Sequence, residues 1–165
     1  MSQGDSAHQG PIKKEEIKMS IQDNLKLDEE NFEAWNAHDV DRSLAIYSDD
    51  ILWQDVGSPQ ALEGRDAVRQ YIQTWFLAFP DIKLTVTNRL VTEDQVAGEL
   101  EWIGTHSGPL QFGPGAPALP ATGKKVTGKG TYFVRVRDNK AVEVHTYLDT
   151  AGLMMQLGLM PMPGS

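Results

Sequence analysis

Apolar residues recur at helical spacing in the first part of the chain, starting near Lys14. The stripe is interrupted where Asp28 falls on it, and one long helix is favoured over two short ones. Its apolar positions are Ile17, Ile21, Leu25, Phe32 and Trp35.

Further helices are predicted on either side of a short apolar run. Asp39 or Asp41 can cap a short helix that places Leu44 and Tyr47 on one face. Ile51, Leu52 and Trp53 then indicate a brief strand. Apolar residues at intervals of three and four predict a strong helix over residues 68–79, which Pro80 stops.

Strand patterns dominate the second half of the chain. Residues 82–91, 96–105, 126–137 and 141–149 are rich in β-branched and aromatic side chains and are separated by turn signals. Proline and glycine residues make Ser107–Gly123 a long loop. Helices grouped before a run of strands predict an α+β domain, in which a cone-shaped, curved antiparallel sheet carries the helices on its concave side and encloses a pocket.

Asp149 ends the last strand directly before a Leu/Met-rich run, and is the first candidate for chemistry. Alternation places Glu143, His145, Tyr147 and Asp149 on one side of that strand. If this side is the mouth of the pocket, apolar neighbours would disfavour the ionised carboxyl and suit it to moving protons. If it faces water, Asp149 is merely solvated.

Composition narrows the classes of function. The chain has 165 residues, a net charge of −8, a pI near 4.9 and no cysteine, so disulfides and thiolate chemistry are excluded and nucleic acid is not an expected partner. No apolar run reaches membrane-spanning length, and the start lacks signal-peptide features, so a cytoplasmic location is expected. Residues 1–12 are expected to be a disordered tail and residues 13–165 a single domain.

Four stretches of the sequence resemble the SnoaL-like polyketide cyclase (ester cyclase) family, which has the cone-shaped fold of nuclear transport factors. The closing pattern Asp-x-x-Gly-Leu-x-x-Gln-Leu-Gly is the strongest of them. The stretches are Ala34–Asp39, Gly64–Asp66 with Phe79–Asp81, Gly104–Gly108, and Tyr147–Leu153 leading to Gln156–Gly158.

The resemblance implies intramolecular aldol closure of a hydrophobic carbonyl compound, without cofactor or metal. The catalytic aspartate of the family matches Asp149, which would take a proton from carbon and return one to the new alkoxide. His106, and His145 or Tyr147, could hold the enolate oxygen. The resemblance also implies a homodimer that uses the outer face of the sheet.

The pocket lining is expected to come mainly from aromatic residues, although such residues at regular spacing are often plain core. The candidates for binding substrate are Trp35, Trp53, Asp55, Trp75, Phe79, Trp102, Leu110, Phe112, Tyr132 and Tyr147.

Three alternatives stay open. The segment Ala45–Ser58 resembles the ketosteroid isomerase stretch that ends in a proton-carrying aspartate, here Asp55, but Asn31 and Thr131 stand where that family has its oxyanion donors. An epoxide hydrolase needs Arg and Asp two apart on one strand, and Arg135 and Arg137 lack that partner. A protein of the same fold can also bind a small molecule, or dimerise, without catalysis.

Overall fold

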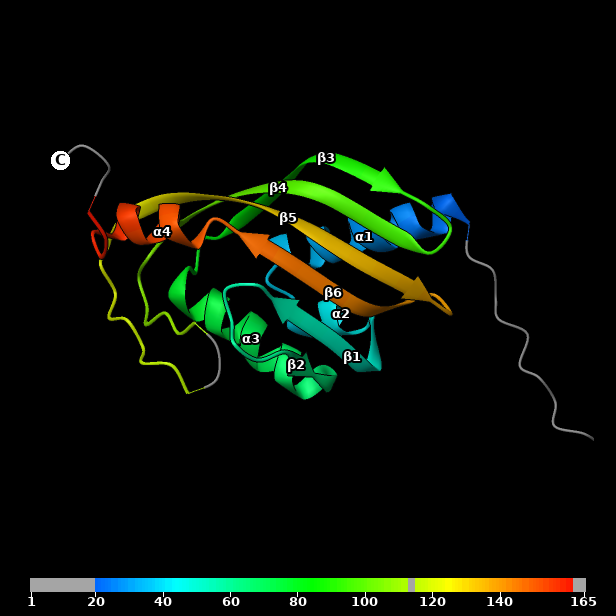
Figure 1. The fold of residues 1–165 in the computed structure, drawn as a ribbon, viewed down its shortest axis with the longest axis horizontal. Coiled ribbons are helices and arrows are strands. Elements are labelled where there is room, and N and C mark those ends of the chain that lie inside the picture. The colour runs from blue at the N-terminus through cyan, green and yellow to red at the C-terminus, as the bar shows by residue number, and fades with distance from the viewer. Residues whose placement is uncertain (1–19, 113–114, 162–165) are drawn as a thin grey trace, which may run out of the picture.

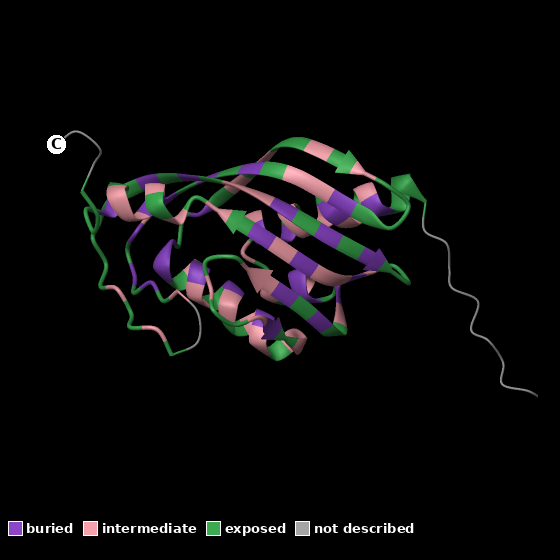
Figure 2. Cartoon of the chain, viewed as in Figure 1, coloured by how far each residue is buried: buried purple, intermediate pink, exposed green. Residues whose placement is uncertain are grey.

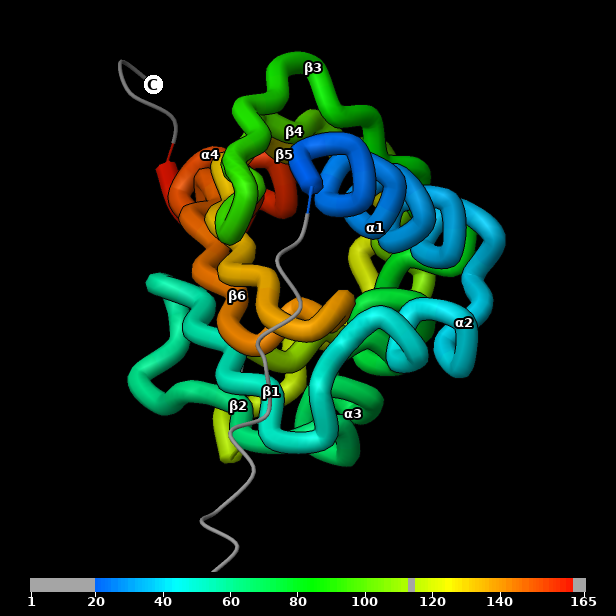
Figure 3. Tube along the Cα trace, turned by 90° about the vertical axis from the view of Figure 1, so that its right-hand side faces the viewer, coloured from blue at the N-terminus to red at the C-terminus, as the bar shows by residue number. Residues whose placement is uncertain are grey.

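A curved sheet of six strands carries three helices on one face in the computed structural model, which describes residues 20–112 and 115–161 (Figure 1). The predicted α+β architecture is confirmed. Viewed end on, the helices and the strands form a ring around the interior (Figure 3). The elements are α1 (Ile21–Asn36), α2 (Val40–Leu44), β1 (Tyr47–Asp55), β2 (Leu62–Glu63), α3 (Gly64–Ala78), β3 (Lys83–Val91), β4 (Gln95–Thr105), β5 (Lys125–Arg137), β6 (Lys140–Leu148) and α4 (Thr150–Leu157).

Helix α1 is a single helix, as its spacing predicts. Ser20 caps it: the Ser20 side chain accepts a hydrogen bond from the Asp23 backbone N–H, and the Asp23 carboxylate accepts one in return from the Ser20 N–H. The earlier part of the predicted helix, and the expected tail over residues 1–12, lie outside the described residues.

Helix α2 is shorter than predicted. Asp39 caps it through a hydrogen bond from the Arg42 backbone N–H, and it ends at Leu44. Tyr47, which was expected on the same helix face as Leu44, instead begins β1. Strand β1 therefore spans Tyr47–Asp55 rather than the three apolar residues that predicted it.

The sheet has the strand order β2-β1-β6-β5-β4-β3. Strands β3 to β6 form the predicted antiparallel meander, whereas β1 runs parallel to β6 and makes the sheet mixed. Buried and exposed residues alternate along β5, so one face of the sheet is covered by the helices and the other is open (Figure 2).

Helix α3 ends as expected immediately before the turn at Pro80, and packs its buried positions Val68, Ile72 and Trp75 toward the sheet. The long loop after β4 is closed at its base where the His106 N–H donates to the Lys124 carbonyl and the Gly123 N–H donates to the His106 carbonyl. The Leu/Met-rich run after β6 folds as α4, which buries Leu153 and Leu157.

Candidate functional site

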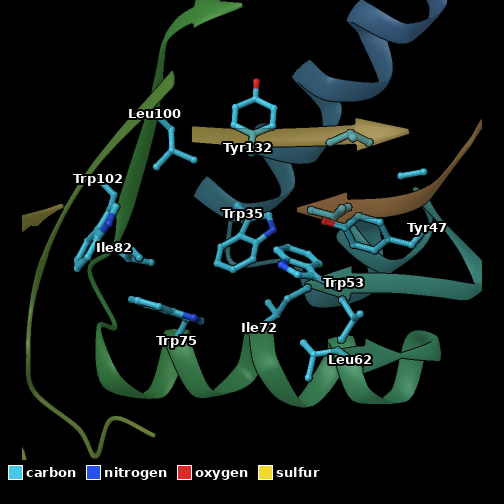
Figure 4. Close-up of a cluster of buried hydrophobic side chains, with 14 of the residues drawn as sticks. Trp35, Tyr47, Trp53, Leu62, Ile72, Trp75, Ile82, Leu100, Trp102 and Tyr132 are labelled. Atoms are coloured by element: carbon cyan, nitrogen blue, oxygen red, sulfur yellow. The ribbon is translucent and has the colours of Figure 1, made fainter. Parts of the chain in front are cut away.

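A cavity of about 80 Å3 lies between the sheet and the helices. Aromatic and aliphatic side chains from α1, α3 and the strands point toward one another around it (Figure 4). Its walls are mostly apolar, which is typical of a site for a hydrophobic small molecule. The lining residues are Leu27, Asp28, Asn31, Phe32, Trp35, Ile46, Tyr47, Trp53, Tyr71, Trp75, Ile82, Leu84, Leu100, Trp102, Tyr132, Val134, Ala141, Val144, Thr146 and Leu148.

Two glycines position two of the wall aromatics. Gly98 of β4 pairs with Tyr132 of β5, and Gly128 of β5 pairs with Trp102 of β4. A Cβ at Gly98 would lie 2.6 Å from the Tyr132 hydroxyl oxygen, and one at Gly128 would lie 2.0 Å from Nε1 of Trp102. Each ring thus lies across the glycine opposite it, and any side chain there would displace the ring.

A buried carboxylate, that of Asp28, lies at the α1 wall of the cavity. Only 2 % of the surface of Asp28 is exposed to solvent. Oδ2 accepts a hydrogen bond of 2.9 Å from the Tyr132 hydroxyl and lies 2.7 Å from Nε of Arg89. Burial raises the pKa of Asp28, and the bonds from Tyr132 and Arg89 oppose that rise without cancelling it. Burial is therefore the dominant effect on the pKa of this carboxyl group.

Asn31 and Tyr47 extend this polar patch. Asn31 follows Asp28 by three residues on α1, so the two side chains lie on one helix face. The Tyr47 hydroxyl donates to Oδ1 of Asn31 at 2.7 Å. Burial raises the pKa of Tyr47 to about 12, so this hydroxyl keeps its proton at neutral pH.

A second compartment adjoins the cavity at the end of the sheet nearest α4. The two spaces share Tyr71, Trp75, Trp102 and Leu148. The further lining residues of this outer compartment are Asp55, Gly57, Ser58, Gln60, Leu62, Gln111, Phe112, Asp149, Thr150 and Leu153.

Asp55 is fixed at the end of β1 in the outer compartment. It accepts hydrogen bonds from the Tyr71 hydroxyl at 3.0 Å and from the Gly57 backbone N–H at 2.9 Å. Burial raises the pKa of Tyr71 well above its ordinary value, and the negative charge of Asp55 adds to the rise. Tyr71 is consequently a hydrogen-bond donor that links the two compartments.

Asp149 lies in the outer compartment, but the expected apolar shelter is wrong. The residue is exposed. Strand β6 stops at Leu148, and Asp149 caps α4 through a 2.8 Å hydrogen bond from the Gly152 N–H to its Oδ1. Asp149 is therefore an N-cap residue that also lines the outer compartment.

The two candidate histidines lie away from both spaces. His106 is fully buried beneath Phe79, with ring centroids 5.3 Å apart, and its Nδ1 lies 3.1 Å from the Thr122 hydroxyl oxygen. His145 lies on the open face of the sheet, where its Nε2 is 2.7 Å from Oε1 of Glu143. Strand alternation points Thr146, not His145, toward the cavity, which corrects its expected place at the pocket.

Three other candidate binding residues are also placed elsewhere. Phe79 and Leu110 are fully buried core residues that line neither compartment. Tyr147 is on the open face of the sheet and is 45 % exposed. The candidates that do line one or both compartments are Trp35, Trp53, Asp55, Trp75, Trp102, Phe112 and Tyr132.

Sequence reasoning missed the polar groups of the cavity. Asp28, Asn31, Tyr47 and Tyr71 were not among the expected site residues. One signal was present: Asp28 interrupts the apolar stripe of its helix, and a carboxylate on a buried stripe needs partners that only the folded chain supplies.

The templates for other chemistries are not assembled in this part of the chain. Arg135, considered for an epoxide hydrolase, pairs with Glu143 on the open face at 3.0 Å. No group of three or more His, Asp or Glu side chains in residues 20–112 and 115–161 could hold a metal ion. None of the described helices is long and apolar enough to span a membrane.

Comparison with known proteins agrees with this geometry. A family model of the SnoaL-like polyketide cyclases matches residues 27–157. No curated protein matches the chain.

Solved structures extend the likeness over most of the chain. AclR from Streptomyces galilaeus, a proposed hydroxylase, is 27% identical with a TM-score of 0.74, over 88% of this chain and 87% of its own. IdmH from Streptomyces antibioticus, a proposed polyketide cyclase, is 26% identical with a TM-score of 0.67, over 81% and 97%. A SnoaL-like protein from Jannaschia sp. CCS1 shares the fold, at 21% identity and a TM-score of 0.74, over 85% and 94%.

Proposed function

The chain belongs to the SnoaL-like polyketide cyclase family, and on this basis we propose that it is a cofactor-independent enzyme acting on a hydrophobic carbonyl compound. The proposed reaction is an intramolecular aldol closure or a related acid/base step. The observation that carries the proposal is the apolar cavity, which adjoins a compartment where two carboxylates, Asp55 and Asp149, are fixed.

Asp149 is the proposed proton carrier. It would take a proton from a carbon between two carbonyl groups, leaving an enolate whose carbon attacks a third carbonyl, elsewhere in the same molecule. The new carbon–carbon bond turns that carbonyl oxygen into an alkoxide, to which Asp149 returns the proton. One oxygen of Asp149 is held by the Gly152 N–H, which fixes the carboxylate while the other oxygen reacts.

The exposure of Asp149 places one demand on the substrate. A carboxylate in water is a weak base, and catalysis gains when water is displaced from around it. We infer that the apolar body of the bound substrate supplies this cover, together with the nearby side chains of Phe112 and Leu153. His106 and His145 have no role in this proposal, because neither lines a compartment.

The test is Asp149→Asn, which keeps the shape and removes the proton carrier. The readout is exchange of the α-hydrogens of an apolar β-keto ester for deuterium, followed by NMR at mildly acidic pH, where uncatalysed exchange is slow. Turnover should fall by about 10²–10⁴-fold with binding nearly unchanged. Ser58→Ala, in the same compartment, is the matched control. A variant with the wild-type exchange rate would rule out Asp149.

The second candidate function is a non-catalytic binding protein for a hydrophobic small molecule. The solvent exposure of Asp149 favours it, because no described side chain buries that carboxylate. The two functions separate in one experiment: a binding protein would take up apolar carbonyl compounds without accelerating α-hydrogen exchange in any of them.

We also propose that the protein is a homodimer joined through the open face of the sheet. Phe133 is 50 % exposed there, and its ring lies 6.0 Å from that of Tyr147 in an edge-on arrangement. Aromatic rings in such a position are typical of protein interfaces. Sedimentation should give twice the chain mass at micromolar concentration, and Phe133→Lys should give a monomer. The cytoplasm is the location we propose for it.

A further inference from the structure

The carboxylate of Asp28 has one oxygen engaged and one free. Oδ2 is taken by the Tyr132 hydroxyl and by Arg89. Oδ1 accepts no hydrogen bond from any residue that the structure describes, although Asp28 is almost fully buried and lines the cavity. An acceptor at the wall of an apolar cavity is poorly solvated, and a ligand that donates to it would supply the missing hydrogen bond.

Asn31 presents the complementary group one helical turn away. Its Oδ1 is occupied by the Tyr47 hydroxyl, which fixes the orientation of the amide. The Nδ2 amide group of Asn31 donates no hydrogen bond to any residue that the structure describes. Asn31 also lines the cavity. The α1 wall therefore offers a free acceptor and a free donor about 5–6 Å apart at their Cβ atoms.

We propose that this α1 wall is a binding subsite for a ligand hydroxyl, such as a phenol or an enol, which donates to Asp28 and accepts from Asn31. A neutral hydroxyl fits better than an ammonium group. Arg89, which also lies 3.7 Å from the more exposed Glu29, already pairs with Asp28, so a second cation would face the Arg89 guanidinium inside apolar walls.

The position of the subsite predicts how the substrate of the proposed reaction is oriented in the cavity. This prediction rests on the proposed function. Tyr132 lies opposite Thr146 in the sheet, and Asp149 follows Thr146 by three residues. Asp149 itself lies one residue beyond the end of β6. A substrate would thus carry a hydroxyl at its inner end and its reacting carbonyls at the opposite end, toward Asp149.

The subsite can be tested by binding alone, without turnover. The probes are 4-ethylphenol and 4-ethyltoluene, in which a methyl group replaces the hydroxyl, titrated while the indole N–H signals of the tryptophans are followed by NMR. The wild type should bind the phenol more tightly than the hydrocarbon. In the double variant Asp28→Leu with Arg89→Met, which removes the whole ion pair, the preference should fall by about 10- to 100-fold.

Two control variants separate this subsite from its surroundings. Tyr132→Phe removes the bond to Oδ2 and leaves Oδ1 free, so the preference for phenol should persist. Asp149→Asn should also keep the preference while it abolishes hydrogen exchange, so failure of the catalytic proposal and failure of the subsite give different results.

A wild type that binds 4-ethyltoluene as tightly as 4-ethylphenol, or that binds neither, overturns the subsite even if no variant folds. Tighter binding of 4-ethylbenzylamine than of 4-ethylphenol would overturn the assignment to a neutral hydroxyl. An unchanged preference in the folded double variant would show that another group binds the hydroxyl.

Discussion

The hydroxyl of Tyr132, on β5, lies 2.9 Å from Oδ2 of Asp28, on α1. The bond joins the helical layer to the sheet at the wall of the cavity, which both residues line. Figure 4 shows Tyr132 on β5. The bond also uses the proton of Tyr132 to hold a carboxylate that burial would otherwise drive toward its neutral form.

The raised pKa of Asp28 predicts a specific dependence of stability on pH. The folded state holds the proton of Asp28 more tightly than the unfolded state. Proton binding by Asp28 therefore stabilises the folded state fully below the unfolded pKa of about 3.9. It is lost as pH rises through the folded pKa. Urea unfolding of the wild type and of Asp28→Asn between pH 4 and 8 should show this loss in the wild type alone. Parallel pH profiles of the two proteins would contradict it.

Asp81 should produce the opposite dependence. Its carboxylate accepts hydrogen bonds from the backbone N–H and the side-chain hydroxyl of Thr105, at 2.6 and 2.8 Å, and these lower its pKa. The ionised Asp81 carboxylate therefore stabilises the folded state above the unfolded pKa of this group. The stabilisation is lost as the pH falls through its folded pKa. Asp81→Asn should lower stability at pH 7, measured by urea unfolding, and leave it unchanged at pH 2. The exposed Asp138→Asn is the control.

Gly152 should set the position of the Asp149 carboxylate. A Cβ at this glycine would lie 2.2 Å from Oδ2 of Asp149, so Gly152→Ala must displace the carboxylate while leaving its charge intact. Deuterium exchange by this variant should fall by at least about tenfold. Ala151→Gly, one position earlier on α4, should exchange at the wild-type rate. If Gly152→Ala retains full exchange, the position of the carboxylate is not important to the reaction.

The glycines opposite the wall aromatics should tolerate no side chain. Gly98→Ala and Gly128→Ala would each force an aromatic ring out of place and should destabilise the protein by about 1–3 kcal/mol in urea unfolding. Lys129→Ala, on the exposed face of β5, should leave the stability almost unchanged. Small losses in both glycine variants would mean that the rings move freely.

Local patterns predicted the elements well where one physical cause dominates. Spacing of apolar residues and Pro80 defined the α3 region, and β-branched and aromatic residues between turn signals defined β3 to β6. The short helix failed at Tyr47, because the pairing of β1 with β6 is a long-range interaction that the local sequence does not contain.

The site was harder to predict, because it depends on which side of a strand faces inward. Alternation correctly separated Thr146 from His145, but it could not tell which of the two faces the helices would cover. Asp149 lies one residue beyond the strand, where the backbone turns into α4 and the alternation no longer applies. The contact between Asp28 and Tyr132 spans more than a hundred positions, and only the folded sheet brings it about.

Each of the strands β4 and β5 places a glycine opposite an aromatic residue of the other strand. These glycines influence the shape of the cavity although they do not contact its contents. Gly98 and Gly128 do not line the cavity, yet the flat seating of Tyr132 and Trp102 depends on them. One methyl group added behind a ring would push that wall inward, so the size of molecule the protein accepts can be tuned from positions that no ligand ever reaches.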